Sequence, residues 1–295
     1  MASRTYEPLG PDSLTWRYYG DARIILLGTW MVLMHSMWPP LGAAIEQQSD
    51  LLNKPIHRAA RSMADMMAVV YGRDVAAVAG RRIRDYHRGV SAQIGDDSQV
   101  SVPPGFYHSM EPRTFYWAHA CFFMAMLFTA DKFCDGLSEA QCRQLFDEHV
   151  RWYAQYGVTM RPVPSSWDEF LAYWEGMAAN LCPTPTTQAL LAMSPPGLSG
   201  YLAGPALRGA RWIAAGCMPD PVRRQLLVSW TGRDERRLRR LGAVVATVSR
   251  WLPDRVLLHP IAYAAMHPGH RKGRVSEAAS VLCAWTVLAA AAVLR

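Results

Sequence analysis

The segment 58–119 decides how the chain is expected to fold, and it contains three pieces: Arg58-Ala-Ala-Arg61-Ser62, Ile83-Arg84-Asp85-Tyr86-His87 and Tyr116-Trp117-Ala118-His119. On a helix, residues at i, i+3 and i+4 point in the same direction, so a short piece can present several polar side chains on one face. Helical spacing could therefore gather two histidines and two arginines around one pocket. We expect the rest of the chain to form the walls and supports of that pocket.

The sequence around this segment predicts an all-α protein. No stretch of useful length alternates apolar and polar residues in the manner of a strand. Helix starts are indicated at Asp21, Pro55, Ser138 with Gln141, Ser165 or Ser166, and Thr231 or Gly232. Helices are expected over residues 74–94 and 115–133, among others. We divide the chain into an N-terminal arm (1–19), a helical domain (20–260) and a C-terminal apolar helix (261–295).

Composition limits the class of protein. The chain has 295 residues, of which 51% are apolar, and a mean hydropathy of −0.03, which is typical of a soluble globular protein with a sizeable core. The net charge of +7 comes almost wholly from arginine, since Lys54, Lys132 and Lys272 are its lysines. No recognisable nucleic-acid module accompanies this charge, so we expect no nucleic-acid partner.

Cysteine spacing and the first residues indicate the compartment. The six cysteines form no CxxC pair and no metal-finger spacing, and several lie in apolar stretches, where a free cysteine acts as a small apolar residue. Residues 1–23 lack a basic start followed by an apolar run. The expectation is therefore a reducing, cytoplasmic location.

Three features bear on membrane contact. Residues 24–38 are apolar but too short to span a bilayer, so we expect a buried helix. Residues 278–294 carry no charge, yet they fall short of the ~20 residues that a spanning helix needs. A helix packed on the body is the favoured interpretation. Arg233, Arg236, Arg237 and Arg240 share one helix face. A solvated face neutralised by Asp234 and Glu235 is favoured, with peripheral contact with anionic lipid or a redox partner as the alternative.

Several enzyme classes lack the residues they need. No HExxH, no paired-carboxylate site and no Gly-x-Ser-x-Gly elbow is present, which disfavours the hydrolases. No glycine-rich strand-to-helix turn is present either, which disfavours nucleotide binding. An all-α chain with 11 Trp, 12 Tyr and 15 Met could surround a haem with apolar walls, but composition alone does not select that reading.

A set of short motifs, in a fixed order, adds a resemblance. They are Gly20-Asp21-Ala22-Arg23, Pro39, Ser49-Asp50, Arg58-x-x-Arg61-Ser62, Tyr71-Gly72, His87, Gly105-x-Tyr107, Glu111-Pro112, Trp117-x-His119 and Gly157-Val158. Each motif is weak alone, and their order and spacing give the signal. Together they resemble the family that unites bacterial latex clearing proteins (rubber oxygenases) with a fungal ER-bound oxygenase of mycophenolic acid biosynthesis. The likeness runs from residue 20 to about 171, with an echo at 230–253.

The resemblance implies a globin-like helical core that holds haem b and uses dioxygen on an isoprenoid carbon–carbon double bond. It implies that His87 is the proximal iron ligand, and that a nearby group would have to accept a hydrogen bond from its other ring nitrogen. Arg58, Arg61 and Ser62 match the distal Arg-x-x-Lys-Thr element, and a cation there could stabilise bound oxygen or a haem propionate. His119 matches a histidine beside the haem. The resemblance also implies a carboxylate that acts as a base in rubber cleavage, and Glu46 is the nearest candidate for it.

The chain also departs from the family. Arg61 and Ser62 replace lysine and threonine, and arginine is a poor iron ligand because it stays protonated. Trp38 stands where family members often have histidine, with His35 three residues earlier. We expect a hydrophobic small-molecule substrate, such as a terpenoid or prenylated metabolite, together with dioxygen. Two alternatives remain open: a helical haem- or lipid-binding protein without turnover, and a structural helical protein at a membrane surface.

Overall fold

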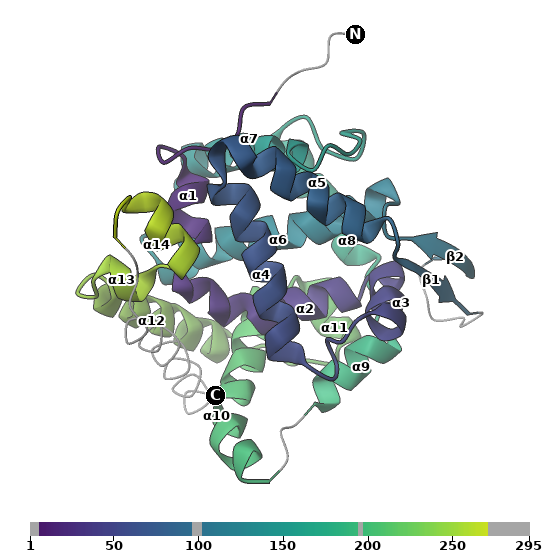
Figure 1. Cartoon of the computed structure of the whole chain (residues 1–295). Coiled ribbons are helices and arrows are strands. Elements are labelled where there is room, and N and C mark those ends of the chain that lie inside the picture. Colours follow the sequence, from purple (N-terminus) through teal and green to yellow (C-terminus); the bar gives the residue numbers. More distant parts are fainter. Residues whose placement is uncertain (1–5, 96–101, 194–196, 271–295) are drawn as a thin grey trace.

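The computed structural model describes residues 6–95, 102–193 and 197–270, and these form an all-α protein with one small hairpin (Figure 1). The elements of the first half are α1 (Leu14–Tyr19), the 3-10 helix η1 (Ala22–Leu27), α2 (Gly28–Ser36), α3 (Pro39–Gln48), α4 (Pro55–Tyr71), η2 (Arg73–Val75), α5 (Ala76–His87), β1 (Ser91–Ile94), β2 (Gly105–His108) and α6 (Pro112–Phe133). Those of the second half are α7 (Glu139–Ala154), α8 (Trp167–Ala179), α9 (Pro185–Ala192), α10 (Gly197–Cys217), α11 (Asp220–Gln225), α12 (Gly232–Ser249), α13 (Asp254–Leu257) and α14 (Pro260–Met266). The expected fold class is confirmed.

Helix α6 is the centre of the fold. It is apolar around most of its circumference, as expected for a helix that other elements surround, and η1, α1, α2, α3, α7 and α12 contact it (Figure 1). Trp117 is fully buried, and its ring stacks on Trp174 of α8 at a centroid distance of 4.7 Å. The carboxylate of Glu111 accepts hydrogen bonds from the backbone N–H groups of Arg113 and Thr114 and so fixes where α6 begins.

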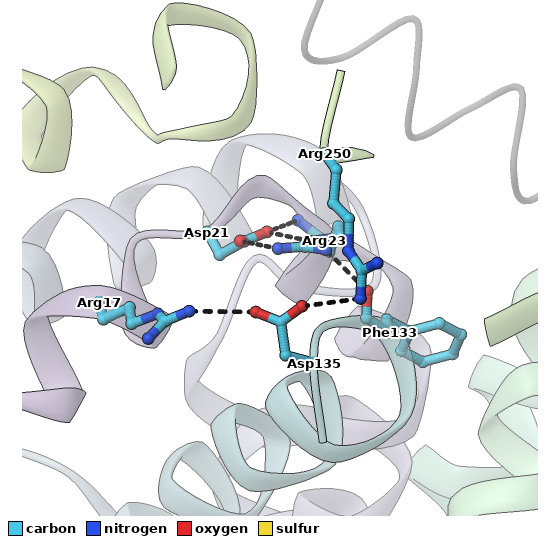
Figure 2. Close-up of polar contacts among 6 residues, drawn as sticks. All are labelled: Arg17, Asp21, Arg23, Phe133, Asp135 and Arg250. Atoms are coloured by element: carbon cyan, nitrogen blue, oxygen red, sulfur yellow. Dashed lines mark hydrogen bonds and ion pairs between the residues drawn. The ribbon is translucent and has the colours of Figure 1, made fainter. Parts of the chain in front are cut away.

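The motif Gly20-Asp21-Ala22-Arg23 joins the N-terminal part of the chain to the end of α6. The Asp21 carboxylate caps η1 and accepts two hydrogen bonds from the Arg23 guanidinium, at 2.8 and 2.6 Å. Arg23 Nη1 donates a third, of 2.8 Å, to the carbonyl oxygen of Phe133 (Figure 2). At Gly20 a Cβ atom would collide with Ala262 and Tyr71, so only glycine fits there. This motif is a structural joint.

Capping signals in the sequence predicted several helix starts correctly. Ser138 and Gln141 form a reciprocal capping box at α7, and Thr231 caps α12. Pro55 is the first residue of α4. The expected buried helix at 24–38 is confirmed, divided into η1 and α2.

Two expectations of local structure were wrong. The helix expected over 74–94 ends at His87, and β1 follows, paired antiparallel with β2. Side chains of α3 cover β1: Gln47 Nε2 donates to the Gln93 carbonyl at 2.8 Å, and Gln48 Nε2 donates to the Ser91 carbonyl at 3.0 Å. The expected arm contains α1, whose Trp16 is fully buried and donates from Nε1 to the Val70 carbonyl at 2.8 Å.

The helices in the described ranges are limited in apolar length. There no single helix is long and apolar enough to cross a bilayer, and the pair Ala22–Ser36 and Pro39–Gln48 reaches the required length and composition only together, with a bend of 103°. The apolar segment 278–294 lies outside the described residues.

Candidate active site

His87, the last residue of α5, has one ring nitrogen engaged and one available. Its Nδ1 lies 2.8 Å from the carbonyl oxygen of Ile83, one turn earlier, so Nδ1 carries the hydrogen and donates it. The lone pair is then on Nε2. Burial lowers the pKa of His87; the Ile83 carbonyl opposes this, and the positive charge of Arg58 adds to it. The imidazole is therefore neutral near pH 7 and able to bind a metal ion through Nε2.

Contacts on two further sides hold His87 in place. The ring of Phe115, on α6, meets the imidazole edge to face, with centroids 5.8 Å apart. Ser109 Oγ donates to the carbonyl oxygen of His87, which ties the end of α5 to the loop after β2. The position of the histidine is thus set by α5, α6 and the hairpin together.

Arg58 and Ser62 lie across from His87 on α4 and form a polar pair. Arg58 Nη1 donates to Ser62 Oγ, one turn along the helix, and both side chains are half-buried. The Arg58 charge lowers the pKa of His87 and of His35, so it acts on side chains of two other helices. Arg61 was predicted to face the same cavity, but its side chain is exposed. The turn of α4 brings together Arg58 and Ser62 and leaves Arg61 on the surface.

His35, on α2, is a residue of this site that the sequence indicated only by its place three residues before Trp38. Its Nε2 lies 3.0 Å from the carbonyl oxygen of Ala118, so Nε2 donates and Nδ1 keeps a lone pair. Burial lowers the pKa of His35 to about 4, with a further contribution from the Arg58 charge. A lone histidine in an apolar helix gives no signal of such a place, because most of these are core residues.

Helix α6 relates the two histidines in space. His87 contacts Phe115, whereas His35 contacts Ala118 and the Phe122 ring, with ring centroids 5.4 Å apart. Ala118 and Phe122 follow Phe115 by three and seven residues, which corresponds to about 5–10 Å along a helix that rises 1.5 Å per residue. Two neutral imidazoles, each with one lone pair, therefore lie along the same side of α6, with Arg58 within electrostatic range of both.

Glu46 and Trp38 do not contribute polar groups to this cluster. Glu46 is exposed on α3, and among the described residues no hydrogen bond joins it to His87 or His35. Trp38 is buried: its Nε1 donates to Thr114 Oγ1 at 3.0 Å, and the guanidinium of Arg113 lies 4.8 Å from the centre of its ring. The tryptophan packs on the start of α6, so at this position an apolar packing contact stands in place of the histidine that family members often have.

His119 lies in a separate buried layer behind Phe115. Its Nδ1 is 3.1 Å from the hydroxyl of Tyr156, and its ring stacks on His149 at 4.6 Å. His149 Nε2 in turn lies 3.0 Å from the hydroxyl of Tyr116. Burial lowers the pKa of His119 to about 3 and that of His149 well below its usual value. This layer is neutral, and Phe115 connects it to His87 through its contact with Tyr156. Sequence reasoning missed His149.

In the described part of the chain, no group of three or more histidine, cysteine, aspartate or glutamate side chains is placed to hold a metal ion.

The fold and this site define an all-α protein with a neutral, oriented histidine beside an arginine–serine pair in a half-buried position. The chain belongs to the family described as ER-bound oxygenase mpaB/B'/Rubber oxygenase, catalytic domain, whose sequence profile matches residues 16–247. The match includes all the site residues discussed above and confirms the resemblance. It makes an oxygenase, and hence an oxidoreductase, the supported class of enzyme. No curated protein and no solved structure matches the chain.

Proposed function

We propose that this protein is a haem b-dependent oxygenase that uses dioxygen to oxidise a hydrophobic isoprenoid or terpenoid substrate. The observation that carries the proposal is the hydrogen bond from His87 Nδ1 to the Ile83 carbonyl oxygen. Histidines that bind metals usually donate their other ring N–H to such an acceptor, which fixes the tautomer and the orientation of the ring. The family of oxygenase catalytic domains supplies the reaction class.

The residues present fit a haem. His87 would bind the iron through Nε2, with the Phe115 ring against the imidazole. When bound, haem supplies an iron centre at which dioxygen can be activated. The guanidinium of Arg58 carries a positive charge, so it would attract a propionate or negative charge that develops on oxygen. Ser62 holds the guanidinium of Arg58 in position by accepting its hydrogen bond.

Apolar side chains near the histidines suit a hydrophobic substrate. Met31 lies one turn before His35 on α2, Met63 follows Ser62 on α4, and the Phe122 ring contacts His35. All three are half-buried and packed against the core. Such walls favour an apolar ligand and exclude water, with a few polar groups to orient it. The Nδ1 lone pair of His35 could accept a hydrogen bond from a polar group of the substrate.

Absorption spectra of the purified protein test the haem proposal. The full chain, supplied with haemin, should show a Soret band, and His87→Gly should lose it while its far-UV circular dichroism stays unchanged. Added imidazole should restore the band in His87→Gly by replacing the missing ligand. The matched control is His57→Ala, because His57 is an exposed histidine on α4. A colourless wild-type protein, or a band that survives in His87→Gly without imidazole, would refute the proposal.

A second candidate function is haem or lipid binding without turnover. The observation that favours it is that Arg61 and Glu46, two of the predicted catalytic residues, are exposed. Oxygen-electrode measurements with the reduced, haem-loaded protein and a panel of terpenes and polyisoprenoids distinguish the two. Substrate-dependent oxygen consumption that Arg58→Ala reduces supports the oxygenase, whereas stable oxygen binding without consumption supports the alternative.

A further inference from the structure

Helix α12 has one face turned to the core and one to the solvent. Its inner residues Leu238, Leu241 and Val245 are buried. At Gly242 a Cβ atom would collide with the carbonyl oxygen of Lys132, so α12 lies directly against the end of α6. Figure 1 shows α12 at the periphery of the molecule, where its opposite face is turned outward. That outer face has two halves of different chemistry.

The first half of the outer face is cationic. Arg233, Arg236, Arg239 and Arg240 are all exposed, and among the described residues none of them has a carboxylate within ion-pair distance. The positive charge is therefore concentrated on about two turns of helix.

The acidic residues that were expected to neutralise this face are engaged elsewhere. Asp234 Oδ2 accepts a hydrogen bond of 3.0 Å from the backbone N–H of Thr231, and Glu235 Oε2 accepts one of 3.0 Å from Trp230 Nε1. Both carboxylates serve the start of α12 and its packing. Asp234 also lies within electrostatic range of Arg237, so the expected neutralisation holds for that arginine, whereas Arg233, Arg236, Arg239 and Arg240 have no ion-pair partner among the described residues.

The second half of the outer face is apolar and exposed. Val244 and Val248 are 59% and 53% exposed, and Trp251, directly after the helix, is 86% exposed. Residues 233, 240, 244 and 251 follow one another at helical spacing, so two of the arginines, Val244 and Trp251 lie on one line. An exposed tryptophan on this line is costly in water, but it suits the boundary between lipid headgroups and acyl chains.

We propose that the outer face of α12, from Arg233 to Trp251, binds the surface of an anionic lipid bilayer. The arginines contact lipid phosphates, and Val244, Val248 and Trp251 enter the headgroup–acyl boundary, as in helices that lie in the membrane plane. Charge complementarity selects an anionic partner. The three exposed apolar side chains favour lipid over a purely polar anionic surface, because such a surface would leave them in water. This inference does not depend on haem binding.

Vesicle co-sedimentation of the full chain tests the proposal. Phosphatidylcholine vesicles with and without about 30% phosphatidylglycerol serve as probes, at low salt and at 0.5 M salt. We expect binding only to the anionic vesicles. Salt should weaken it because salt screens exposed charges, with a Debye length of about 8 Å at physiological ionic strength. R236Q/R239Q/R240Q should reduce the partition coefficient at least about tenfold, and W251A should reduce it severalfold.

Two matched controls separate a specific face from overall charge and stickiness. R81Q/R161Q/R224Q removes the same number of exposed arginines from other surfaces, and F106A removes an exposed aromatic side chain from β2. Both should bind like the wild type. Equal losses in the control and test triple variants, equal binding to neutral and anionic vesicles, or binding to poly-L-glutamate but not to vesicles would each overturn the proposal.

Discussion

The joint between Asp21 and Arg23 provides the sharpest test of how the fold is held together. We consider Arg23→Ala. The side chains of Arg23 and Asp21 are 17% and 7% exposed, and their ion pair measures 2.6 Å between Arg23 Nη2 and Asp21 Oδ2. The substitution removes two hydrogen bonds to the carboxylate and one to the carbonyl oxygen of Phe133 (Figure 2). It leaves a buried carboxylate without its partner.

The expected cost follows from that loss. Breaking a fully buried ion pair by removing one partner costs about 3–5 kcal/mol, because the remaining charge stays desolvated. The pair here keeps some exposure, and Asp21 retains its bond from the backbone N–H of Arg23, so about 2–4 kcal/mol is expected. For a domain of this size each kcal/mol lowers the melting temperature by about 2 °C. Arg23→Ala should therefore melt about 4–8 °C earlier.

Arg17 supplies the matched control within the same view. Arg17 Nη2 pairs with Asp135 Oδ2 at 3.0 Å, but the two side chains are 57% and 51% exposed (Figure 2). Exposed pairs contribute at most about 1 kcal/mol, since water and salt screen them. Arg17→Ala should thus cost less than about 1 kcal/mol. Urea unfolding followed by circular dichroism measures both variants, with Arg23→Lys as a variant that keeps the charge and loses the planar fork.

A double-mutant cycle closes the test. Asp21→Asn removes the charge and keeps an acceptor for the η1 cap, so Arg23→Ala in that background should cost clearly less than in the wild type. The difference is the coupling between the two side chains. A cost of Arg23→Ala no larger than that of Arg17→Ala, or no coupling in the cycle, would refute the assignment of this motif as a structural joint.

Three further predictions concern buried groups. The pKa values of His35 and His119 in the folded protein are about 4 and about 3, below the unfolded value near 6.5. The unfolded state therefore binds more protons, and stability falls as the pH drops below about 6.5. Between pH 7 and 5 each histidine should lower the free energy of unfolding, measured in urea, by about 2 kcal/mol, and His119→Gln should flatten this pH dependence. Arg58→Ala should raise the pKa of His35 in an NMR titration, whereas Arg61→Ala, at an exposed position, should not; equal effects would contradict the placement of Arg58. Gly242→Ala should destabilise the protein by about 1–3 kcal/mol because backbone blocks the new methyl group. At Gly232 a new methyl group would meet only the end of the Arg236 side chain, at 3.6 Å, so Gly232→Ala should be neutral or mildly stabilising. Thermal melts that rank the two variants the other way would contradict the α12–α6 contact.

The helical part of the fold could be predicted because its signals are local. Ser138 with Gln141 and Thr231 each satisfy backbone N–H groups within their own first turn, so a few residues of sequence suffice. The hairpin could not be predicted in this way. Strands of four residues have too few positions to show alternation, and β1 depends on glutamines of α3 that lie more than 40 residues earlier.

The candidate site likewise has one part that local sequence predicts and another that depends on how the helices pack. The requirement that His87 bond an acceptor through its other ring nitrogen follows from metal chemistry, and Ile83, one turn earlier, meets it. Whether Arg61 or Ser62 turns inward depends on which side of α4 other helices cover, and three-residue spacing does not settle that. Glu46 was chosen by distance along the chain, whereas His35 is placed by the packing of α2 against α6.

The family motifs in this chain perform two different tasks, and the two can be separated by experiment. Gly20, Asp21 and Arg23 hold the ends of helices together at the far end of α6 from Phe115, so their presence supports the fold without bearing on a reaction. His87, Arg58 and Ser62 leave a lone pair and a cation in a half-buried place. We expect these three residues to bear on ligand binding more than on stability. Substitutions at Gly20, Asp21 or Arg23 should therefore lower stability and leave the ligand affinity of the remaining folded protein unchanged. Substitutions at His87, Arg58 or Ser62 should lower ligand affinity and leave stability largely unchanged.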